Sequence, residues 1–196
     1  MSKAVNIIVF ITITIILFSA LIQYESFTSE LVSTVSTIDG RKYLVRNRID
    51  KQKAANLLAI VRKKCTYLCE YLGDKYTDNI AVNRLINKFN PNNMIESSKN
   101  SRYTSYSINK GERIVFCIRS RDDKEKLVKL NVLMFVALHE LAHIMTKSIG
   151  HTDEFWSNFK FLLQQAVDAK IYKNQDFRRK PVKYCGTEIT DSPLND

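Results

Sequence analysis

All three histidines of this 196-residue chain lie in one short stretch, HELAHIMTKSIGH, at residues 139–151. The nine residues before it, LNVLMFVAL, are apolar nearly all round, which predicts a buried helix that continues into the stretch. Four residues advance a helix by about 400°, so His139 and His143 lie about 40° apart on one face. Burying two imidazoles and the Glu140 carboxylate without partners costs several kcal/mol. A bound metal ion removes that cost.

The HELAH spacing gives each of its polar residues a distinct role. The ring nitrogens of His139 and His143 can converge on one ion at about 2.0–2.1 Å, the usual zinc–imidazole distance. Glu140 is the next residue round the helix, so its carboxylate lies beside the ion and can accept a proton from water. HExxH on a helix is the zinc-protease signature with this division of roles. We therefore predict one catalytic zinc ion, with Glu140 as the catalytic residue.

A catalytic zinc ion needs a third protein ligand and one open position. His151 is the candidate, but eight residues of continuous helix would separate it from His143 by about 12 Å, so the helix must end first. Gly150 supplies a break and Thr152 an N-cap for the next helix, which predicts a corner that folds His151 back to the ion. Glu154 is the alternative third ligand, although in the first turn of a helix it also has a purely stabilising role.

Hydrophobic periodicity and turn residues predict the remaining elements. Helices are expected at residues 50–72, 78–89, 124–148 and 152–169, with Gly73 as the stop of the first. A β-hairpin is expected within residues 103–119, around Asn109-Lys110-Gly111-Glu112. Residues 41–48 are expected to hold a short strand, and residues 172–196 to be loop-like. Segregated elements of this kind favour an α+β fold over a doubly wound sheet.

The N-terminus differs from the rest of the chain. Residues 4–22 carry no charge and span about 28 Å as a helix, close to the roughly 30 Å hydrocarbon core of a bilayer. We expect an uncleaved signal anchor, because the bulky Phe18 makes FSA a poor cleavage site; a cleaved signal peptide is the alternative. Lys3 precedes the segment and two glutamates follow it. The positive-inside rule therefore places the N-terminus in the cytosol and the remaining domain on the lumenal or extracytosolic side.

These segments suggest four parts of the chain: an anchor at residues 1–23, a Ser/Thr-rich spacer at 24–40, the folded domain at 41–175 and a C-terminal tail at 176–196. The four cysteines, Cys65, Cys69, Cys117 and Cys185, allow two disulfides in three pairings if the domain is lumenal. Buried free thiols are the alternative.

The formal net charge of the chain is +10. Basic residues are spread over residues 41–48, 62–64 and 178–183 instead of forming one stripe. This distribution favours a solvated surface over a nucleic-acid groove, so nucleic acid is not the expected partner.

HELAH followed by GHTDEFW resembles the WLM and SprT-like zinc metallopeptidases, which carry HExxH, a short connection and a histidine that opens an HxxxF(W/Y) helix. The matching positions are His139, Glu140, His143, His151, Phe155 and Trp156. The resemblance covers residues 103–169 and is strongest to short members from large DNA viruses. It implies a small zincin-like core, one catalytic zinc ion and hydrolysis of a protein or peptide substrate. Family members that cleave DNA-bound proteins are soluble and carry extra binding modules, whereas this chain begins with a membrane segment.

Two other functions remain open at this point. The chain could be a zinc-stabilised, membrane-tethered binding module that cleaves nothing, or a DNA-directed SprT-like protease, which would need the domain in the cytosol. In the metallopeptidase reading, an extended substrate can pair with the edge of the predicted hairpin. A group that stabilises the developing oxyanion is also expected. The candidates for that group are Tyr103, Tyr106, Arg113, Tyr172 and Tyr184.

Overall fold

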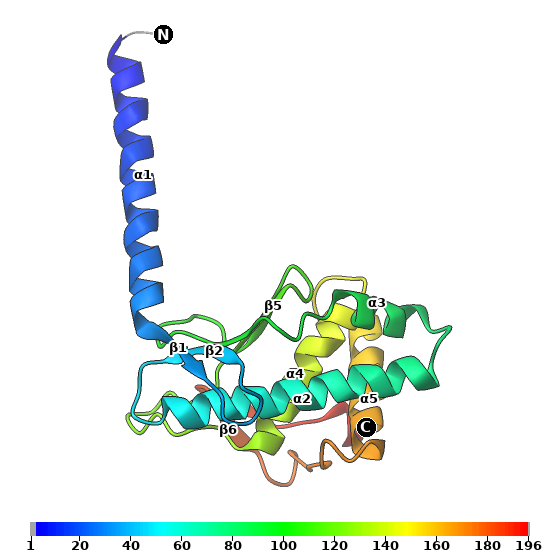
Figure 1. The fold of residues 1–196 in the computed structure, drawn as a ribbon. Coiled ribbons are helices and arrows are strands. Elements are labelled where there is room, and N and C mark those ends of the chain that lie inside the picture. The colour runs from blue at the N-terminus through cyan, green and yellow to red at the C-terminus, as the bar shows by residue number, and fades with distance from the viewer. Residues whose placement is uncertain (1–2, 196) are drawn as a thin grey trace.

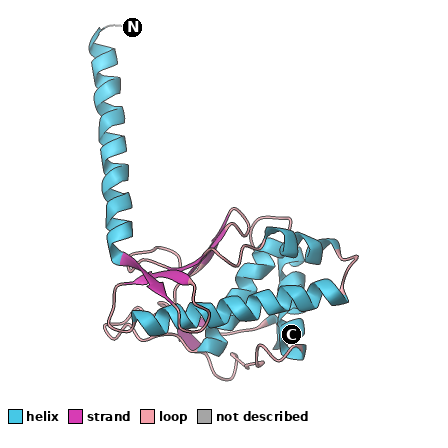
Figure 2. Cartoon of the chain, in the orientation of Figure 1, coloured by secondary structure: helices cyan, strands magenta, loops and turns pink. Residues whose placement is uncertain are grey.

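The computed structural model describes residues 3–195, and Figures 1 and 2 show its helices and strands. The elements are α1 Lys3–Glu30, β1 Leu31–Val35, β2 Lys42–Arg46, α2 Lys51–Lys75, α3 Ile80–Lys88, β3 Met94–Glu96, β4 Tyr106–Ile108, β5 Arg113–Phe116, α4 Leu130–Met145, α5 Asp153–Asp168, β6 Val182–Tyr184, β7 Thr187–Ile189 and the 3-10 turn η1 Pro193–Asn195. Helices and strands stand in separate groups, so the fold is α+β, as the sequence predicted.

Helix α1 stands away from the remaining elements (Figure 1). Its residues Val5–Ile22 form a span long and apolar enough to cross a membrane, and none of them is buried. A signal sequence would have the same properties. The hydroxyls of Thr12 and Thr14 donate to backbone carbonyls four residues earlier, which satisfies both polar groups within the helix.

The spacer predicted at residues 24–40 is wrong. Helix α1 continues to Glu30, and β1 follows it directly and pairs with β2 in an antiparallel hairpin. Leu31 is buried, so this strand belongs to the folded domain. The prediction failed because β1 contains the polar residues Ser33 and Thr34, of which Ser33 is exposed and Thr34 is buried, and these residues suggested a spacer.

The central sheet has the strand order β3-β5-β4. Strand β5 pairs in parallel with β3 and antiparallel with β4, and the β4–β5 hairpin confirms the one predicted within residues 103–119. Strand β3 was not predicted, because three residues are too few to show a periodicity. Its buried Glu96 accepts hydrogen bonds from the backbone N–H of Arg46 and from the Arg119 guanidinium. This carboxylate therefore links the β1–β2 hairpin to the central sheet.

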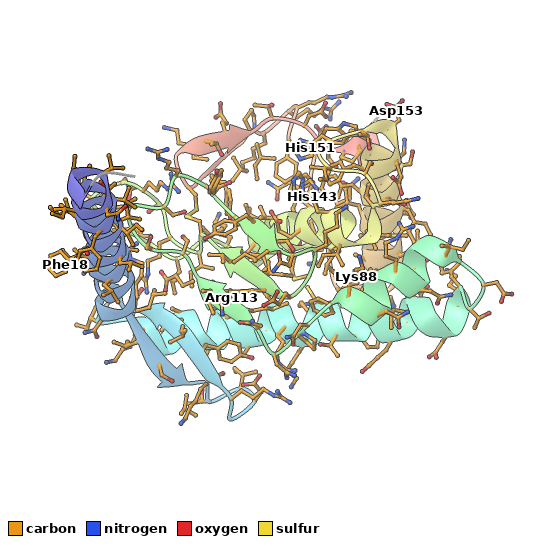
Figure 3. All side chains as sticks on the ribbon, turned by 90° about the horizontal axis from the view of Figure 1, so that it is seen from above. Phe18, Lys88, Arg113, His143, His151 and Asp153 are labelled. Carbon is orange, nitrogen blue, oxygen red and sulfur yellow. A yellow bond between two sulfur atoms is a disulfide. The ribbon has the colours of Figure 1, made fainter. Side chains whose placement is uncertain are left out.

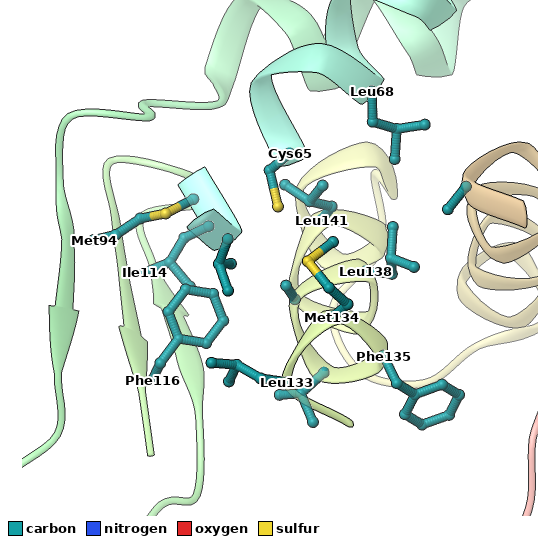
Figure 4. Close-up of a cluster of buried hydrophobic side chains, with 14 of the residues drawn as sticks. Cys65, Leu68, Met94, Ile114, Phe116, Leu133, Met134, Phe135, Leu138 and Leu141 are labelled. Carbon is teal, nitrogen blue, oxygen red and sulfur yellow. The ribbon is translucent and has the colours of Figure 1, made fainter. Parts of the chain in front are cut away.

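Helix α4 forms the centre of the hydrophobic core. All its residues from Val132 to Leu138 are buried, which accounts for the apolar run before the HELAH motif. Figure 4 shows α4 side chains such as Leu138 between side chains from the sheet, such as Phe116, and from α2, such as Leu68. Each such burial stabilises the fold by about 1.5–3 kcal/mol. The core thus fixes both the position and the rotation of the motif helix.

Three predicted helix boundaries are wrong, and one of them is the end of α4, which lies at Met145 and not at residue 148. Helix α4 begins at Leu130 and not near residue 124, because the Asp122 carboxylate accepts two backbone N–H groups in a turn and Glu125 adopts a φ of +43°. Helix α2 runs past Gly73 to Lys75. A Cβ at Gly73 would lie 3.2 Å from Cδ1 of Ile86, so this glycine permits the close approach of α3 and does not end the helix.

The C-terminal segment is not loop-like, as the sequence had suggested. Strands β6 and β7 form an antiparallel hairpin, and η1 follows it. A disulfide joins Cys117, directly after β5, to Cys185 in the β6–β7 turn. Cys65 and Cys69 are buried free thiols, so the alternative reading of these two cysteines is the correct one. The tail lacked a strong signal because its strands are only three residues long.

The turn of the β4–β5 hairpin depends on Gly111. It has a φ of +114°, and a Cβ there would lie 2.4 Å from the carbonyl oxygen of Lys88. Gly40, in the turn between β1 and β2, has a φ of +68° but open space around the same position. The two glycines thus share a left-handed backbone and differ in their surroundings.

We expect Gly111→Ala to lower the free energy of unfolding by about 3 kcal/mol, because strain and overpacking add. Gly40→Ala is the matched control and should cost about 1 kcal/mol, since only the backbone preference is lost. Urea unfolding of the full chain in detergent micelles, followed by the fluorescence of Trp156, the single tryptophan, measures both. An equal decrease in the free energy of unfolding in the two variants would contradict the claim that a Cβ at Gly111 clashes with Lys88.

Candidate metal centre

The structure brings the three histidines together. The Nε2 atoms of His139 and His143 are 3.2 Å apart, and that of His151 lies 3.1 Å from His139 and 3.2 Å from His143. His139 and His143 come from consecutive turns of α4, whereas His151 lies in the corner that precedes α5. Figure 3 shows His143 and His151 close to each other near Asp153, the first residue of α5. These three ring nitrogens can hold one metal ion.

The spacing fits a tetrahedral ion. Two imidazole nitrogens at about 2.0–2.1 Å from a tetrahedral zinc ion are about 3.3–3.4 Å apart, close to the observed separations. Hydrogen bonding does not explain three mutual contacts, because each ring nitrogen directs a single proton or lone pair along one direction. Three lone pairs that face a common centre are the arrangement of a chelating site.

Burial keeps two of the rings in the form that binds metal. Desolvation lowers the pKa of His139 to about 3 and that of His143 to about 4, and neighbouring imidazoles add to both shifts. Both rings are therefore neutral at physiological pH. A neutral imidazole offers a lone pair, so protons do not compete for these two nitrogens near neutrality.

The ring of Phe155 packs against all three histidines. Its side chain is fully buried, and its ring centroid lies 4.4–4.9 Å from those of all three imidazoles. Phe155 thus packs against the motif helix. The side chain of Trp156, the next residue, is exposed, and its ring centroid lies 5.6 Å from that of His151. The difference follows from helix geometry, because adjacent residues point about 100° apart.

The corner that carries His151 is built as the sequence predicted. Helix α4 ends at Met145, Gly150 adopts a φ of +88°, and the Thr152 side chain caps α5. Glu154, the alternative third ligand, has a different role. Its carboxylate accepts the backbone N–H groups of residues 147 and 148, which lowers its pKa to about 2. It fixes the corner from the first turn of α5.

Lys110, which the sequence did not identify as a site residue, holds the same corner in place. Lys110, in the β4–β5 turn, donates to the three successive backbone carbonyls of residues 146–148 at 2.6–2.9 Å. Arg84 of α3 donates to the carbonyl of Met145 and pairs with Glu154 at 3.5 Å. Cations are favoured at these carbonyls because the end of a helix carries negative partial charge. No local pattern identifies Lys110 or Arg84, because each contact spans at least 36 residues.

Glu140 lies beside the histidines on the side of the sheet. Its carboxylate is buried and hydrogen-bonded by the backbone of Ser107 in β4, and desolvation raises its pKa to about 8. A positive ion held by the adjacent imidazoles would act in the opposite direction and favour the charged carboxylate. Glu140 lines the same cavity as the three histidines, and its role as general base stays a prediction.

An open cavity of about 690 Å³ lies over the histidines. One side is formed by β4 and the residues before it, at positions 104–107, and the floor by α4 and the corner. Tyr184, Thr187 and Ile189 of the C-terminal hairpin also line the cavity. A second cavity of about 420 Å³ shares His139 and continues towards Trp156 and residues 191–193. The site is thus an open cleft, in contrast to a closed structural metal site.

Two of the five residues that were candidates for stabilising the oxyanion lie in the cleft. Tyr106 and Tyr184 line it. Tyr103 is exposed outside it, Tyr172 is buried in the core, and the Arg113 guanidinium donates to Asn93.

Many of the basic residues counted in the sequence have acidic partners. Arg46 and Arg48 pair with Glu125, and Arg62 pairs with Asp39. These pairs reduce the charge that the segment at residues 41–48 presents to solvent. The expectation that nucleic acid is not a partner stays a prediction.

The fold and the three-histidine centre together define an α+β protein with an HExxH metal site. The profile described as "WLM domain" matches residues 82–194, more than half of the chain. The chain belongs to the WLM family. The resemblance carried by HELAH and GHTDEFW is thereby confirmed, and the match extends through the C-terminal hairpin.

Proteins of large DNA viruses are similar to this chain. The uncharacterised protein R325 of Acanthamoeba polyphaga mimivirus is 34% identical over 170 residues, which are 85% of this chain and 86% of that protein. The uncharacterised protein 042R of Invertebrate iridescent virus 3 is 40% identical over 101 residues, which are 51% of this chain and 57% of that protein. Among solved structures, Wss1 from Saccharomyces cerevisiae is 20% identical, with a TM-score of 0.47 over 64% of this chain and 87% of that chain.

We expect Lys110→Met to weaken zinc binding by about tenfold or more, because groups that orient metal ligands have effects of this size. The substitution leaves the three carbonyls of residues 146–148 without their donor and loosens the corner that carries His151. Lys147→Met is the matched control, since it removes the same charge from the exposed side of the same corner. Competition with a chromogenic chelator measures the affinities, and equal values for the two variants would refute the clamp.

Proposed function

We propose that the chain is a membrane-anchored, zinc-dependent metallopeptidase. The observation that carries this proposal is the convergence of three imidazole nitrogens beside a buried carboxylate, in a cleft that one sheet edge lines. Membership of the WLM family supports it. The assigned roles are metal ligands for His139, His143 and His151, and general base for Glu140.

The chain's own residues account for the proton transfers of peptide hydrolysis. When bound, zinc supplies Lewis acidity, which polarises a peptide carbonyl and makes water more acidic. Glu140 accepts the proton of the attacking water and passes it to the departing amine. The hydrogen bond from Ser107 to Glu140 orients the carboxylate between the histidines and the sheet edge. Of the two tyrosines that line the cleft, Tyr106 is the group available to stabilise the developing oxyanion, because the single proton of the Tyr184 hydroxyl is donated to the carbonyl of Cys117.

A protein or peptide substrate fits the shape of the cleft. Within the described residues, β4 pairs on one side only, with β5, so its other edge borders the cleft. An extended peptide can add to such an edge through main-chain hydrogen bonds. This placement brings a peptide bond of the substrate alongside Glu140 and the histidines without requiring a particular sequence.

The exposed, apolar α1 supports an anchor that crosses a membrane, with the domain on the lumenal or extracytosolic side. The Cys117–Cys185 disulfide agrees with that side, because disulfides persist in oxidising compartments. Trypsin added to intact microsomes should then leave the domain undigested until detergent is added. Digestion without detergent would place the domain in the cytosol.

Glu140→Gln separates an enzyme from a zinc-stabilised module that cleaves nothing. The amide keeps the size of the side chain but cannot accept the proton, so kcat for labelled casein should fall by about 100-fold or more. Zinc content and unfolding should stay close to those of the wild type. Wild-type protein that binds zinc and cleaves none of a broad peptide library would contradict the proposed function.

A further inference from the structure

The C-terminal hairpin forms one wall of the cleft. Tyr184, Thr187 and Ile189 line the same cavity as β4. The histidines and Glu140 come from α4 and the corner before α5, so the wall and the metal site are separate parts of the chain. A substrate that lies along β4 in this cavity therefore also meets the hairpin.

The hairpin is weak by itself. Each of its strands has three residues, and within the described chain β6 and β7 pair only with each other. An isolated two-stranded hairpin is marginally stable in water. Its two-residue turn also places Cys185 at a φ of +51°, a left-handed conformation that disfavours any residue with a side chain. Something outside the hairpin must hold it in place.

The side chains of Tyr184 and Cys185 are buried in the core, and two further attachments tie the hairpin to Cys117, directly after β5. One is the Cys117–Cys185 disulfide, which joins positions 68 residues apart. The other is the Tyr184 hydroxyl, which donates to the carbonyl of Cys117 and lies 2.7 Å from the Ser105 hydroxyl. The corner that positions His151 has different supports, Lys110 and Glu154. Loss of the disulfide should thus loosen the wall, which keeps only the Tyr184 contacts, and leave the metal site in place.

We propose that the Cys117–Cys185 disulfide is a positioning device for substrate. It holds the β6–β7 wall against the cleft, so that the oxidised protein binds an extended peptide tightly and the reduced protein binds it weakly. The proposal rests on the proposed peptidase function and adds redox control of substrate binding to it. The metal ligands take no part in the change.

The chemistry of the switch is a two-electron reduction. A dithiol attacks one sulfur of the pair, the S–S bond breaks, and a mixed disulfide forms. The second thiol of the reductant then displaces the remaining sulfur. The products are the two thiols of Cys117 and Cys185 and the oxidised, cyclic reductant, so electrons and protons balance.

The test compares oxidised and reduced full-length protein in detergent micelles, loaded with zinc. A phosphine serves as reductant, because dithiols also bind zinc. Labelled casein is the substrate, and thiol titration confirms the state of the cysteines. We expect reduction to raise KM by about tenfold, the scale of a lost preorganised contact surface, with a smaller change in kcat. Zinc should remain at one ion per chain, and reoxidation should restore KM.

Two variants assign the effect to this disulfide. A Cys65→Ala/Cys69→Ala protein has no free thiols, so its response to reduction should match that of the wild type. A Cys117→Ser/Cys185→Ser protein should show the raised KM from the start and no response to the phosphine. An unchanged KM after complete reduction would overturn the proposal. So would loss of zinc in step with reduction, because the disulfide would then support the whole domain.

Hydrogen exchange keeps this proposal separate from the proposed function. Reduction should speed amide exchange in residues 182–189 and leave residues 139–151 unchanged. If the oxidised protein cleaves no casein, the peptidase function fails. The positioning of the hairpin is then decided by exchange alone, and equal protection of residues 182–189 in both redox states would overturn it.

Discussion

The corner between α4 and α5 is the constraint on which the metal centre depends. His139 and His143 need only a helix, but His151 faces them because the chain turns back within the residues after Met145. Three elements fix that turn: Lys110 from the β4–β5 hairpin, Arg84 from α3 and Glu154 from α5. Carbonyls and amides at the helix end are thus satisfied by side chains, which gives the loop the precision that a ligand requires.

The residues directly after strand β5 attach the N-terminal and C-terminal hairpins to the folded domain. Arg119 pairs with Glu96 and Asp50, and Glu96 also accepts the backbone N–H of Arg46, so the N-terminal hairpin is attached there. Cys117 attaches the C-terminal hairpin through its disulfide. Removing one partner of the buried Arg119–Glu96 pair would leave an uncompensated charge, which is costly. Segments from both ends of the folded domain are therefore fixed to the residues that directly follow β5.

The sequence was sufficient to predict those features of the site that depend on the spacing of neighbouring residues. The HELAH spacing, the break at Gly150 and the Thr152 cap predicted a corner with three converging histidines, because each depends on a few adjacent residues. The same approach missed Lys110 and strand β3, and it mistook β1 for a spacer and the C-terminal hairpin for a loop. These features depend on contacts between distant segments or on strands of three to five residues, and neither leaves a periodic pattern.

Zinc content of the full-length protein in detergent micelles tests the central claim most directly. The comparison is between wild type, His151→Ala and Ile149→Ala, an exposed residue of the same corner. The account predicts one zinc ion per chain in the wild type and in Ile149→Ala, and affinity weakened by about 100-fold or more in His151→Ala. Folded wild-type protein without zinc, or His151→Ala protein that binds zinc as tightly as the wild type, would contradict it.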